Sequence, residues 1–379
     1  MQQSVPYKRL SISSFLSQFS IVQFNLVLVF YLKSLSLDSA QIGIASSITP
    51  IVYLLGCLFF PYVMKSINGK KRVLFSLLGM AFCLVFVPLT KSIWILYTLL
   101  VLYGVFQSLL WTNMETWITS TNNEKELNNL ISSFNFSWSS SVGPANLVAG
   151  LLVPLSYYLA FYNSVLALVV AFAIVFSSPY IEKKTDIDED EVEGNKEPSI
   201  LRYPSWAAIF AVYTGYSMLM VVFPQYGLDT LNFSSSLCGR LLFYRGIAVA
   251  FFFVVLSRVK WWQKGRWPIM LSSLCFSLLT LLFIFFKTKI SLAFLFILYG
   301  AVFALSYNLS IFHSAQGDGN RHMRMVIHEV LITAGTTFGS FVGSYIYQYL
   351  SFNALVIMVA IIGLVSFLAA LFFPQKQIA

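Results

Sequence analysis

The sequence contains many long apolar stretches, and their length restricts the fold more than any other feature. Each stretch reaches or approaches the roughly 20 residues that an α-helix needs to cross a bilayer. Only 10% of the residues are charged, against about 25% in soluble domains. The stretches are 10–32, 41–64, 73–90, 92–118, 127–152 and 155–179, followed by 204–228, 236–257, 267–286, 290–313, 325–349 and 352–373. We therefore expect an all-α membrane protein with twelve transmembrane helices.

The chain also repeats itself. Leu102-Tyr103-Gly104 recurs 196 residues later as Leu298-Tyr299-Gly300, each inside an apolar run. Other landmarks keep the same spacing without a gap, namely Gly43 with Gly239, Gly69 with Gly265, Ser139 with Gly335, and Gly143 with Gly339. Glycines mark places where backbones turn or approach closely. The repeat predicts two pseudo-symmetric six-helix bundles, residues 1–181 and 204–379.

A polar segment, residues 182–203, separates the two predicted bundles. It holds eight of the fifteen acidic residues of the chain. Such a composition cannot bury enough apolar surface to fold by itself. We expect a solvated cytoplasmic tether, and a regulatory or partner-binding role for it stays open.

Lys and Arg residues predict the orientation, because they gather on the cytoplasmic side of membrane proteins. With both termini cytoplasmic, that side collects Lys8, Arg9, Lys65, Lys70, Lys71, Arg72, Lys125, the tether, Arg258, Lys260, Lys264, Arg266, Arg321, Arg324 and Lys376. The opposite side holds Lys33, Lys91, Lys287 and Lys289. We expect a multi-pass protein of the cell membrane, with the net charge of +9 reflecting topology rather than nucleic-acid binding.

The sequence carries no motif of a familiar enzyme or metal site. The four cysteines, Cys57, Cys83, Cys238 and Cys275, lie singly within apolar stretches and form no CxxC pair. There is no GxxxxGK[ST], HExxH or GxSxG. We expect no enzymatic activity, no metal and no cofactor.

The loop after the stretch 41–64 reads YVMKSINGKKR. Its end, Gly69, Lys70 and Lys71, matches the signature G-x-L-x-D-R-x-G-R-R, while Ser66 and Ile67 stand at the aspartate and the first arginine. This loop, the two halves and the central tether resemble the major facilitator superfamily. The resemblance implies a transporter whose site lies at the membrane midplane between two bundles. It makes Gly69, Lys70 and Lys71 a conformational loop motif that lacks the family's aspartate.

A second match to that superfamily is weaker. The stretch SVGPANLVAG contains Gly143-Pro144, as in antiporters of the superfamily, but not the paired glycines that follow there. The match is a slight indication of export.

Arg245 is the charge placed deepest in any apolar stretch, near the middle of 236–257. A charge in the hydrocarbon costs roughly 2.5–3.5 kcal/mol on insertion scales, so a retained one has a use. We expect Arg245 to bind an anionic substrate group or a carboxylate, with a structural ion pair as the alternative. Nearer the outer surface, Asp229 and Arg240 could pair as a gate, although snorkelling also explains Arg240.

Two carboxylates and a histidine are candidates for proton coupling or an inner gate. Glu115 follows Gln107 and Trp111 at four-residue spacings, and Glu329 is preceded by His328. Carboxylates in partly apolar surroundings hold protons near neutral pH. Alternatively, Glu115 and Glu329 pair with Arg321, Arg324 or Lys125 and close the inner side.

Uncharged polar and aromatic residues complete the expected substrate path. With Arg245, the candidates are Gln18, Asn25, Gln107, Trp111, Asn135, Tyr216, Tyr307 and Asn308. Each of them could instead form an ordinary interhelical hydrogen bond.

These features together predict a secondary transporter of a small organic anion or zwitterion, working by alternating access and driven by protons. We expect it to act as a monomer in the lipid bilayer. Two other functions remain open: proton-driven efflux of lipophilic compounds, and a non-transporting scaffold or sensor.

Overall fold

The computed structural model describes residues 7–63, 67–118, 124–179, 199–317 and 321–373, and all regular secondary structure within these ranges is helical. Ten of the described helices are long and apolar enough to cross a membrane, and Trp267–Leu282 is a shorter apolar helix. This confirms the all-α architecture expected of the sequence. The predicted count of twelve spans is not reached by this criterion.

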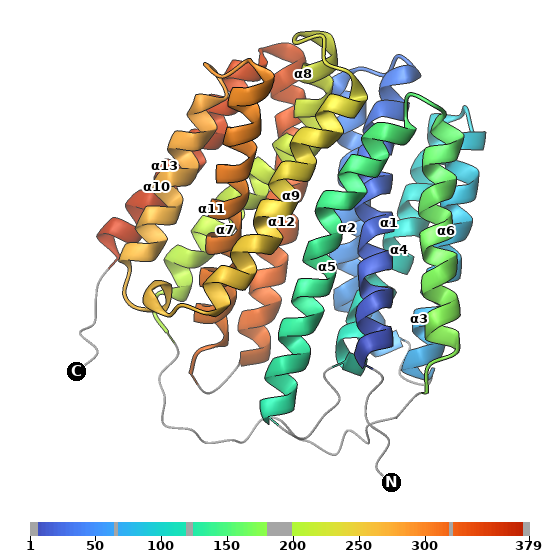
Figure 1. Cartoon of the computed structure of the whole chain (residues 1–379), viewed down its shortest axis with the longest axis horizontal. Helices are drawn as coiled ribbons and strands as arrows, with labels where there is room; N and C mark the ends of the chain where they lie inside the picture. The colour runs from blue at the N-terminus through green and yellow to red at the C-terminus, as the bar shows by residue number, and fades with distance from the viewer. Residues whose placement is uncertain (1–6, 64–66, 119–123, 180–198, 318–320, 374–379) are drawn as a thin grey trace. The chain divides into compact units, whose positions relative to one another are not determined.

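The helices follow one another along the chain as Figure 1 shows. The first part contains α1 (Tyr7–Ser34), α2 (Ser39–Val63), α3 (Gly69–Phe86), η1 (Val87–Leu89), α4 (Ile93–Ile118), α5 (Glu124–Leu152) and α6 (Tyr157–Phe176). The second part contains α7 (Arg202–Ser217), η2 (Met218–Val222), α8 (Phe223–Asp229), α9 (Ser235–Ser257), η3 (Trp261–Gln263), α10 (Trp267–Leu282), α11 (Lys289–Ala315), α12 (Arg321–Tyr349) and α13 (Phe352–Phe372). The π-helical η2 joins α7 and α8 without a break.

Short polar side chains begin several of these helices. The Asn68 side chain accepts a hydrogen bond from the Lys70 amide, that of Thr288 from the Ser291 amide, and that of Ser351 from the Ala354 amide. Such N-caps satisfy backbone donors that have no partner within the helix. These three residues therefore mark where α3, α11 and α13 start.

The helices pack into two compact units. Unit 1 comprises residues 1–185 and 223–247, and unit 2 comprises residues 186–222 and 248–379. The rod α7–α8 changes unit after Val222, and α9 changes unit after Ile247. The bundle boundaries that the sequence suggests, 1–181 and 204–379, stay a prediction, and most of the 182–203 tether lies outside the described residues.

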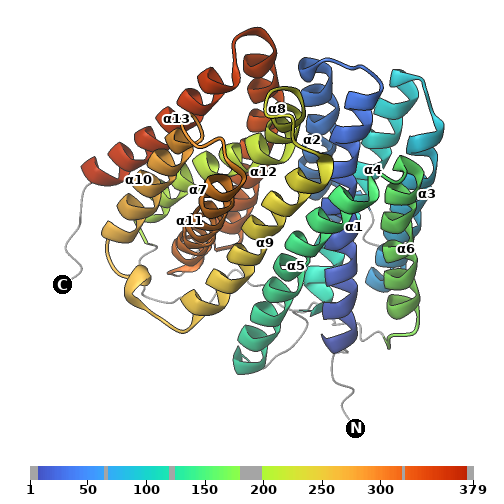
Figure 2. The ribbon, with the colours of Figure 1, turned by 45° about the horizontal axis from the view of Figure 1, so that its top comes forward.

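In unit 1, α1 lies between α5 and α6, as Figures 1 and 2 show, while α3 packs on α4 and α6. Gln23, near the middle of α1, is fully buried. Its Nε2 donates to the Ala160 carbonyl at 3.1 Å, and its Oε1 accepts from Asn163 Nδ2 at 2.9 Å. In a bilayer, interhelical hydrogen bonds of this kind contribute about 0.6 kcal/mol each. They link α1 to α6.

Unit 2 repeats these helix pairs. The pairs α7–α12, α7–α13, α10–α11 and α10–α13 correspond to α1–α5, α1–α6, α3–α4 and α3–α6. Gly335 and Gly339 of α12 lie against α7, and a Cβ on Gly339 would come within 2.3 Å of the Thr214 carbonyl oxygen. These glycines serve close helix packing. The arrangement of pairs agrees with the 196-residue repeat.

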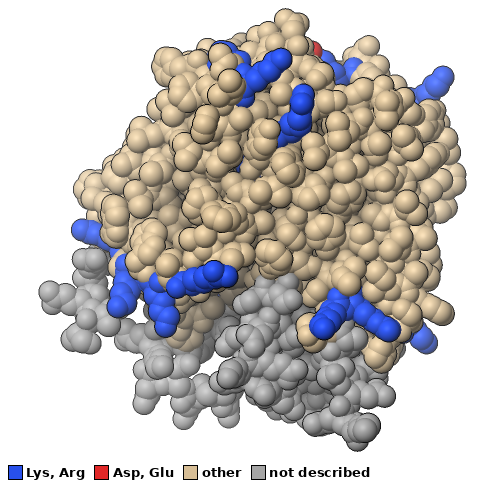
Figure 3. Space-filling view, viewed as in Figure 1, with Lys and Arg blue, Asp and Glu red and all other residues tan. Residues whose placement is uncertain are grey.

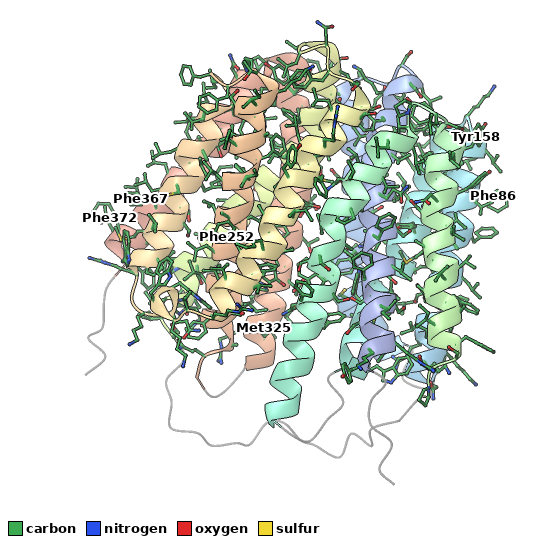
Figure 4. All side chains as sticks on the ribbon, in the orientation of Figure 1. Phe86, Tyr158, Phe252, Met325, Phe367 and Phe372 are labelled. Atoms are coloured by element: carbon green, nitrogen blue, oxygen red, sulfur yellow. The ribbon has the colours of Figure 1, made fainter. Side chains whose placement is uncertain are left out.

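Apolar side chains cover much of the outside of each unit. On the face drawn in Figure 3, the Lys and Arg side chains lie toward the helix ends, and the band between them carries few charged side chains. Figure 4 shows Phe86 and Tyr158 of unit 1 and Phe372 of unit 2 pointing away from their helices, and all three are exposed. Exposed apolar surface of this extent marks the region that lipid would cover.

Candidate functional site

A polar stripe runs along part of α1. Ser11, Gln18 and Asn25 are spaced seven residues apart, so they share one face of the helix. Ser11 and Gln18 are half-buried and Asn25 is exposed, although Phe24 and Leu26 on either side of Asn25 are fully buried. Beyond Asn25, α1 is buried from Leu26 to Leu32. The amide of Asn25 is therefore open to a ligand or to water.

Three further candidates lie on other helices of unit 1, namely Gln107 and Trp111 on α4 and Asn135 on α5. Gln107 and Trp111 are half-buried on α4, and the Gln107 Oε1 atom is buried with no hydrogen-bond partner. The Trp111 ring meets Phe134 of α5 edge-on at 5.9 Å. Asn135 Oδ1 accepts from Trp138 Nε1 at 3.1 Å. The buried acceptor of Gln107 is suited to a ligand that donates a hydrogen bond.

Arg245 of α9 is 1% exposed, so its charge lies inside the protein. Next to it, Gly246 touches the backbone of Gly143 on α5, where a Cβ on Gly246 would be 2.5 Å from the Gly143 nitrogen. Gly239 and Gly150 form a second contact, with a Cβ on Gly239 falling 2.8 Å from the Gly150 Cα. Gly143-Pro144, which the sequence associates with export, thus has a packing role beside Arg245.

The candidates in unit 2 belong to aromatic clusters. The Tyr216 ring lies 5.8 Å from Tyr213 and 5.8 Å from Phe303. The Tyr307 ring lies 5.5 Å from Phe253 and 5.4 Å from His328. Asn308, next to Tyr307 on α11, is half-buried. Tyr216, Tyr307 and His328 are therefore packed among rings.

His328 is fully buried on α12. Its Nδ1 lies 2.8 Å from the Ser310 hydroxyl of α11, and its Nε2 has no hydrogen-bond partner. The next residue, Glu329, is exposed. Glu115 belongs to α4, but its side chain lies outside the described residues. The structure therefore places one buried and one exposed titratable group side by side on α12.

Arg324, a predicted partner of the carboxylates, caps the end of α11. Its Nε donates to the Ser314 carbonyl at 2.8 Å, and an Nη atom donates to the carbonyls of Gln316 at 3.2 Å and Gly317 at 2.8 Å. A cation at a helix C-terminus satisfies unpaired carbonyls and complements the dipole. Pairing of Glu115 or Glu329 with the basic residues stays a prediction.

The partner of Asp229 is Lys33, and this corrects the expected pairing with Arg240. Lys33 Nζ lies 2.7 Å from Asp229 Oδ2, joining the last turn of α1 to the end of α8. Arg240 is exposed on α9. Sequence reasoning did not select Lys33, yet the repeat spacing of 196 residues places Lys33 at the position equivalent to Asp229.

The loop motif has a clear structural role within unit 1. Gly69 is buried and begins α3, and Lys71 is exposed. Lys70 Nζ donates to the carbonyls of Phe176 at 2.8 Å and Ser178 at 2.6 Å, at the C-terminus of α6. In unit 2, Arg266 donates to the Leu371 carbonyl at 2.8 Å near the end of α13. Lys70 and Arg266 are equivalent in the repeat and cap equivalent helices.

A comparison with known families decides the class of the chain. The sequence model of the Major Facilitator Superfamily matches residues 10–318. The chain belongs to the major facilitator superfamily. As a member, it is a multi-pass transporter and not an enzyme. Among the described residues, no group of three or more His, Cys, Asp or Glu could hold a metal ion.

Solved structures of other transporters share the major facilitator fold. The crystal structure of the nucleoside transporter NupG is 13% identical, has a TM-score of 0.75, and covers 97% of this chain and 100% of its own. A POT family transporter in complex with 5-aminolevulinic acid is 10% identical, with a TM-score of 0.80, 98% coverage of this chain and 96% of its own. No curated protein sequence matches the chain. At these identities the likeness establishes the fold.

Proposed function

We propose that this major facilitator moves a small organic anion or zwitterion across the membrane by alternating access. The observation that carries the proposal is Arg245, which is 1% exposed within α9. A guanidinium inside a span costs roughly 2.5–3.5 kcal/mol on insertion scales, and it binds carboxylate or phosphate groups with two parallel hydrogen bonds. A buried guanidinium of this kind is suited to hold an anionic substrate group.

Uncharged groups of unit 1 support the same substrate class. Asn25 is exposed on α1, and Gln107 presents a buried acceptor atom on α4. Amides recognise donors and acceptors of a polar solute without adding charge. A POT family structure of the same fold contains 5-aminolevulinic acid, which carries an amino and a carboxylate group. A zwitterion of that size would use both an arginine and amide side chains.

The test is uptake into proteoliposomes from a panel of small anions, zwitterions and neutral nucleosides. Arg245→Gln should lower anion uptake about 30-fold or more, because truncating a buried charge costs 2 kcal/mol or more. Arg240→Gln is the matched control, since it removes an exposed arginine from the same helix, and it should retain wild-type uptake. Unchanged uptake by a folded Arg245→Gln variant would overturn the substrate assignment.

We further propose that protons drive the transport. His328 supports this as a buried imidazole whose Nδ1 is held by Ser310, and Glu329 and Glu115 supply carboxylates on α12 and α4. Groups that gain or lose charge inside a membrane protein change its conformational preference strongly, because burial penalises the charged form. Uptake should then respond to an imposed proton gradient in the absence of sodium.

Efflux of lipophilic compounds is the second candidate. It is favoured by the aromatic pairs Trp111–Phe134 and Tyr216–Phe303, which could stack on flat apolar molecules. Inverted vesicles loaded with a lipophilic dye separate the two candidates. Proton-driven dye movement that survives Arg245→Gln would support efflux and would exclude a small organic anion as the substrate.

Finally, we propose that the protein works as a monomer in the cell membrane with both termini cytoplasmic. The positive-inside rule supports this orientation, because Arg9, Lys70 and Arg266 lie at the helix ends predicted to be cytoplasmic. Deleting 186–193 tests whether the acidic tether signals to a partner. If the chain is a transporter, transport should largely survive the deletion. If it is a sensor, signalling should fail.

A further inference from the structure

The ion pair between Lys33 and Asp229 joins two positions that the internal repeat makes equivalent. Lys33 Nζ is 2.7 Å from Asp229 Oδ2, and the residues are 196 apart, which is the spacing of the repeat. Lys33 lies in the last turn of α1, and Asp229 is the last residue of α8. One position of the repeat therefore contacts its own counterpart, with opposite charges at the two places.

The chain turns in the same way after both residues. Ser36 (φ 61°) and Asn232 (φ 53°) are the non-glycine residues of positive φ in the described part of the chain. They stand three residues after Lys33 and Asp229, and they too are equivalent in the repeat. Under two-fold symmetry, a position meets its own equivalent only close to the axis. The pair therefore lies where a rotation of one repeat against the other would act on both partners.

Helix capping alone does not explain the pair. A cation at a helix C-terminus is favourable, but an anion there is disfavoured by the dipole, and Asp229 occupies such an end. Lys33 compensates for this charge. The side chains are 30% and 38% exposed, so water screens part of their attraction. A contact of this strength can hold a conformation and still open readily.

The residues of α1 and α8 that precede the ion pair are buried inside unit 1. Leu26–Leu32 of α1 and Phe223–Gly227 of α8 are buried, whereas Asn25 is exposed. The α5–α9 contact is also tight here. Ser236 Oγ donates to the Gly150 carbonyl at 2.9 Å, and a Cβ on Gly150 would lie 2.9 Å from the Gly239 Cα. Four helices, α1, α5, α8 and α9, are therefore in contact at the Lys33 end.

We propose that Lys33 and Asp229 form a latch that holds this end of the transporter closed in the conformation described. The latch breaks when the transporter opens at that end, and the α5–α9 contact at Ser236 separates with it. This inference rests on the alternating access proposed above. According to this proposal, one pair of charges favours the conformation closed at the Lys33 end over the conformation open there.

The test measures how readily position 236 reacts with a membrane-impermeant maleimide added from the Lys33 side. Ser236→Cys serves as the reporter in a chain whose four native cysteines are replaced by alanine. Lys33→Asp and Asp229→Lys each create a like-charged pair, and the double variant exchanges the two charges. Because the positions are equivalent, the exchange preserves the geometry. Arg240→Asp is the control on the same side of α9.

Each single variant should label about two- to five-fold faster than its parent, as expected for the loss of a partly exposed ion pair. The exchanged variant should return to within about two-fold of the parent, and Arg240→Asp should equal the parent. Parent rates in both single variants would overturn the latch, and so would an exchanged variant that labels like the single ones. Thermal unfolding of each variant identifies any that label because they unfold.

Labelling requires no substrate, so this outcome is independent of the uptake panel. If a wild-type chain transports nothing while the latch variants label as expected, the latch stands and the proposed substrate class fails. A bifunctional maleimide joining cysteines introduced by Lys33→Cys and Asp229→Cys gives a second readout. It should block labelling at position 236, and unchanged labelling of the cross-linked protein would contradict the latch.

Discussion

Gly143 of α5 and Gly246 of α9 meet backbone to backbone. A Cβ on Gly246 would lie 2.5 Å from the Gly143 nitrogen, and one on Gly143 would lie 3.1 Å from the Ile247 nitrogen. Seven residues away on each helix, Gly150 and Gly239 repeat the contact. In a bilayer, where lipid is as apolar as the side chains, such close approach of small residues is what allows helices to associate. The contact also positions Arg245, the residue before Gly246.

Gly246→Ala should therefore destabilise the protein by about 1–3 kcal/mol, because the added methyl group would overlap backbone atoms that cannot rotate away. Gly343→Ala is a matched control, since its Cβ would be 3.2 Å from the Leu355 side chain, which can move. Thermal unfolding in lipid nanodiscs measures both variants. Equal unfolding temperatures for the two would show that the α5–α9 contact is not required.

Lys70→Ala should cost about 1 kcal/mol of stability, because the C-terminus of α6 loses a cation that binds two of its carbonyls. Arg266→Ala should cost a similar amount at the equivalent end of α13. Lys71→Ala changes the exposed neighbour and should stay within about 0.5 kcal/mol of wild type. Denaturant unfolding in mixed micelles compares the three. A full effect at Lys71 would argue for a general charge effect and against capping.

Gln23→Leu should destabilise the α1–α6 contact by about 0.6–1.7 kcal/mol, because Ala160 and Asn163 lose their partner. The double variant Gln23→Leu with Asn163→Leu should cost less than the two single changes added together, since one hydrogen bond is removed only once. The comparison is Gln18→Leu, which changes a half-buried residue of α1. This variant should keep wild-type stability and lower substrate uptake. Additive effects at Gln23 and Asn163 would mean that the two do not act as a pair.

His328→Gln should abolish the stimulation of uptake by a proton gradient while leaving exchange of labelled for unlabelled substrate intact. Glutamine keeps a polar group near the Ser310 hydroxyl, 2.8 Å from the imidazole, but does not bind a proton. His313→Gln is the control, because His313 is also buried and its Nδ1 lies 3.0 Å from the Ser199 hydroxyl. Gradient-driven uptake that persists in His328→Gln would move proton coupling to a carboxylate.

Much of the local structure could be predicted from the sequence. Apolar runs determine helices, because a backbone in hydrocarbon must satisfy its own hydrogen bonds. The 196-residue repeat predicted that the loops at Gly69 and Gly265 are equivalent, and Lys70 and Arg266 cap equivalent helices in the structure. Glycines that keep the repeat spacing were expected where backbones turn or approach closely, and Gly335 and Gly339 do approach α7 closely.

The partners of individual side chains were decided only by the tertiary structure. Helical periodicity establishes which residues share a face, but it does not say which helix that face meets. The sequence suggested Arg240 for Asp229 because both lie toward the predicted outer surface, whereas packing brings Lys33 of α1 to the end of α8. Likewise, Asn25 is exposed and Gln23 buried on the same helix. Burial and pairing depend on contacts between residues far apart in the chain, and these exist only once the helices have packed.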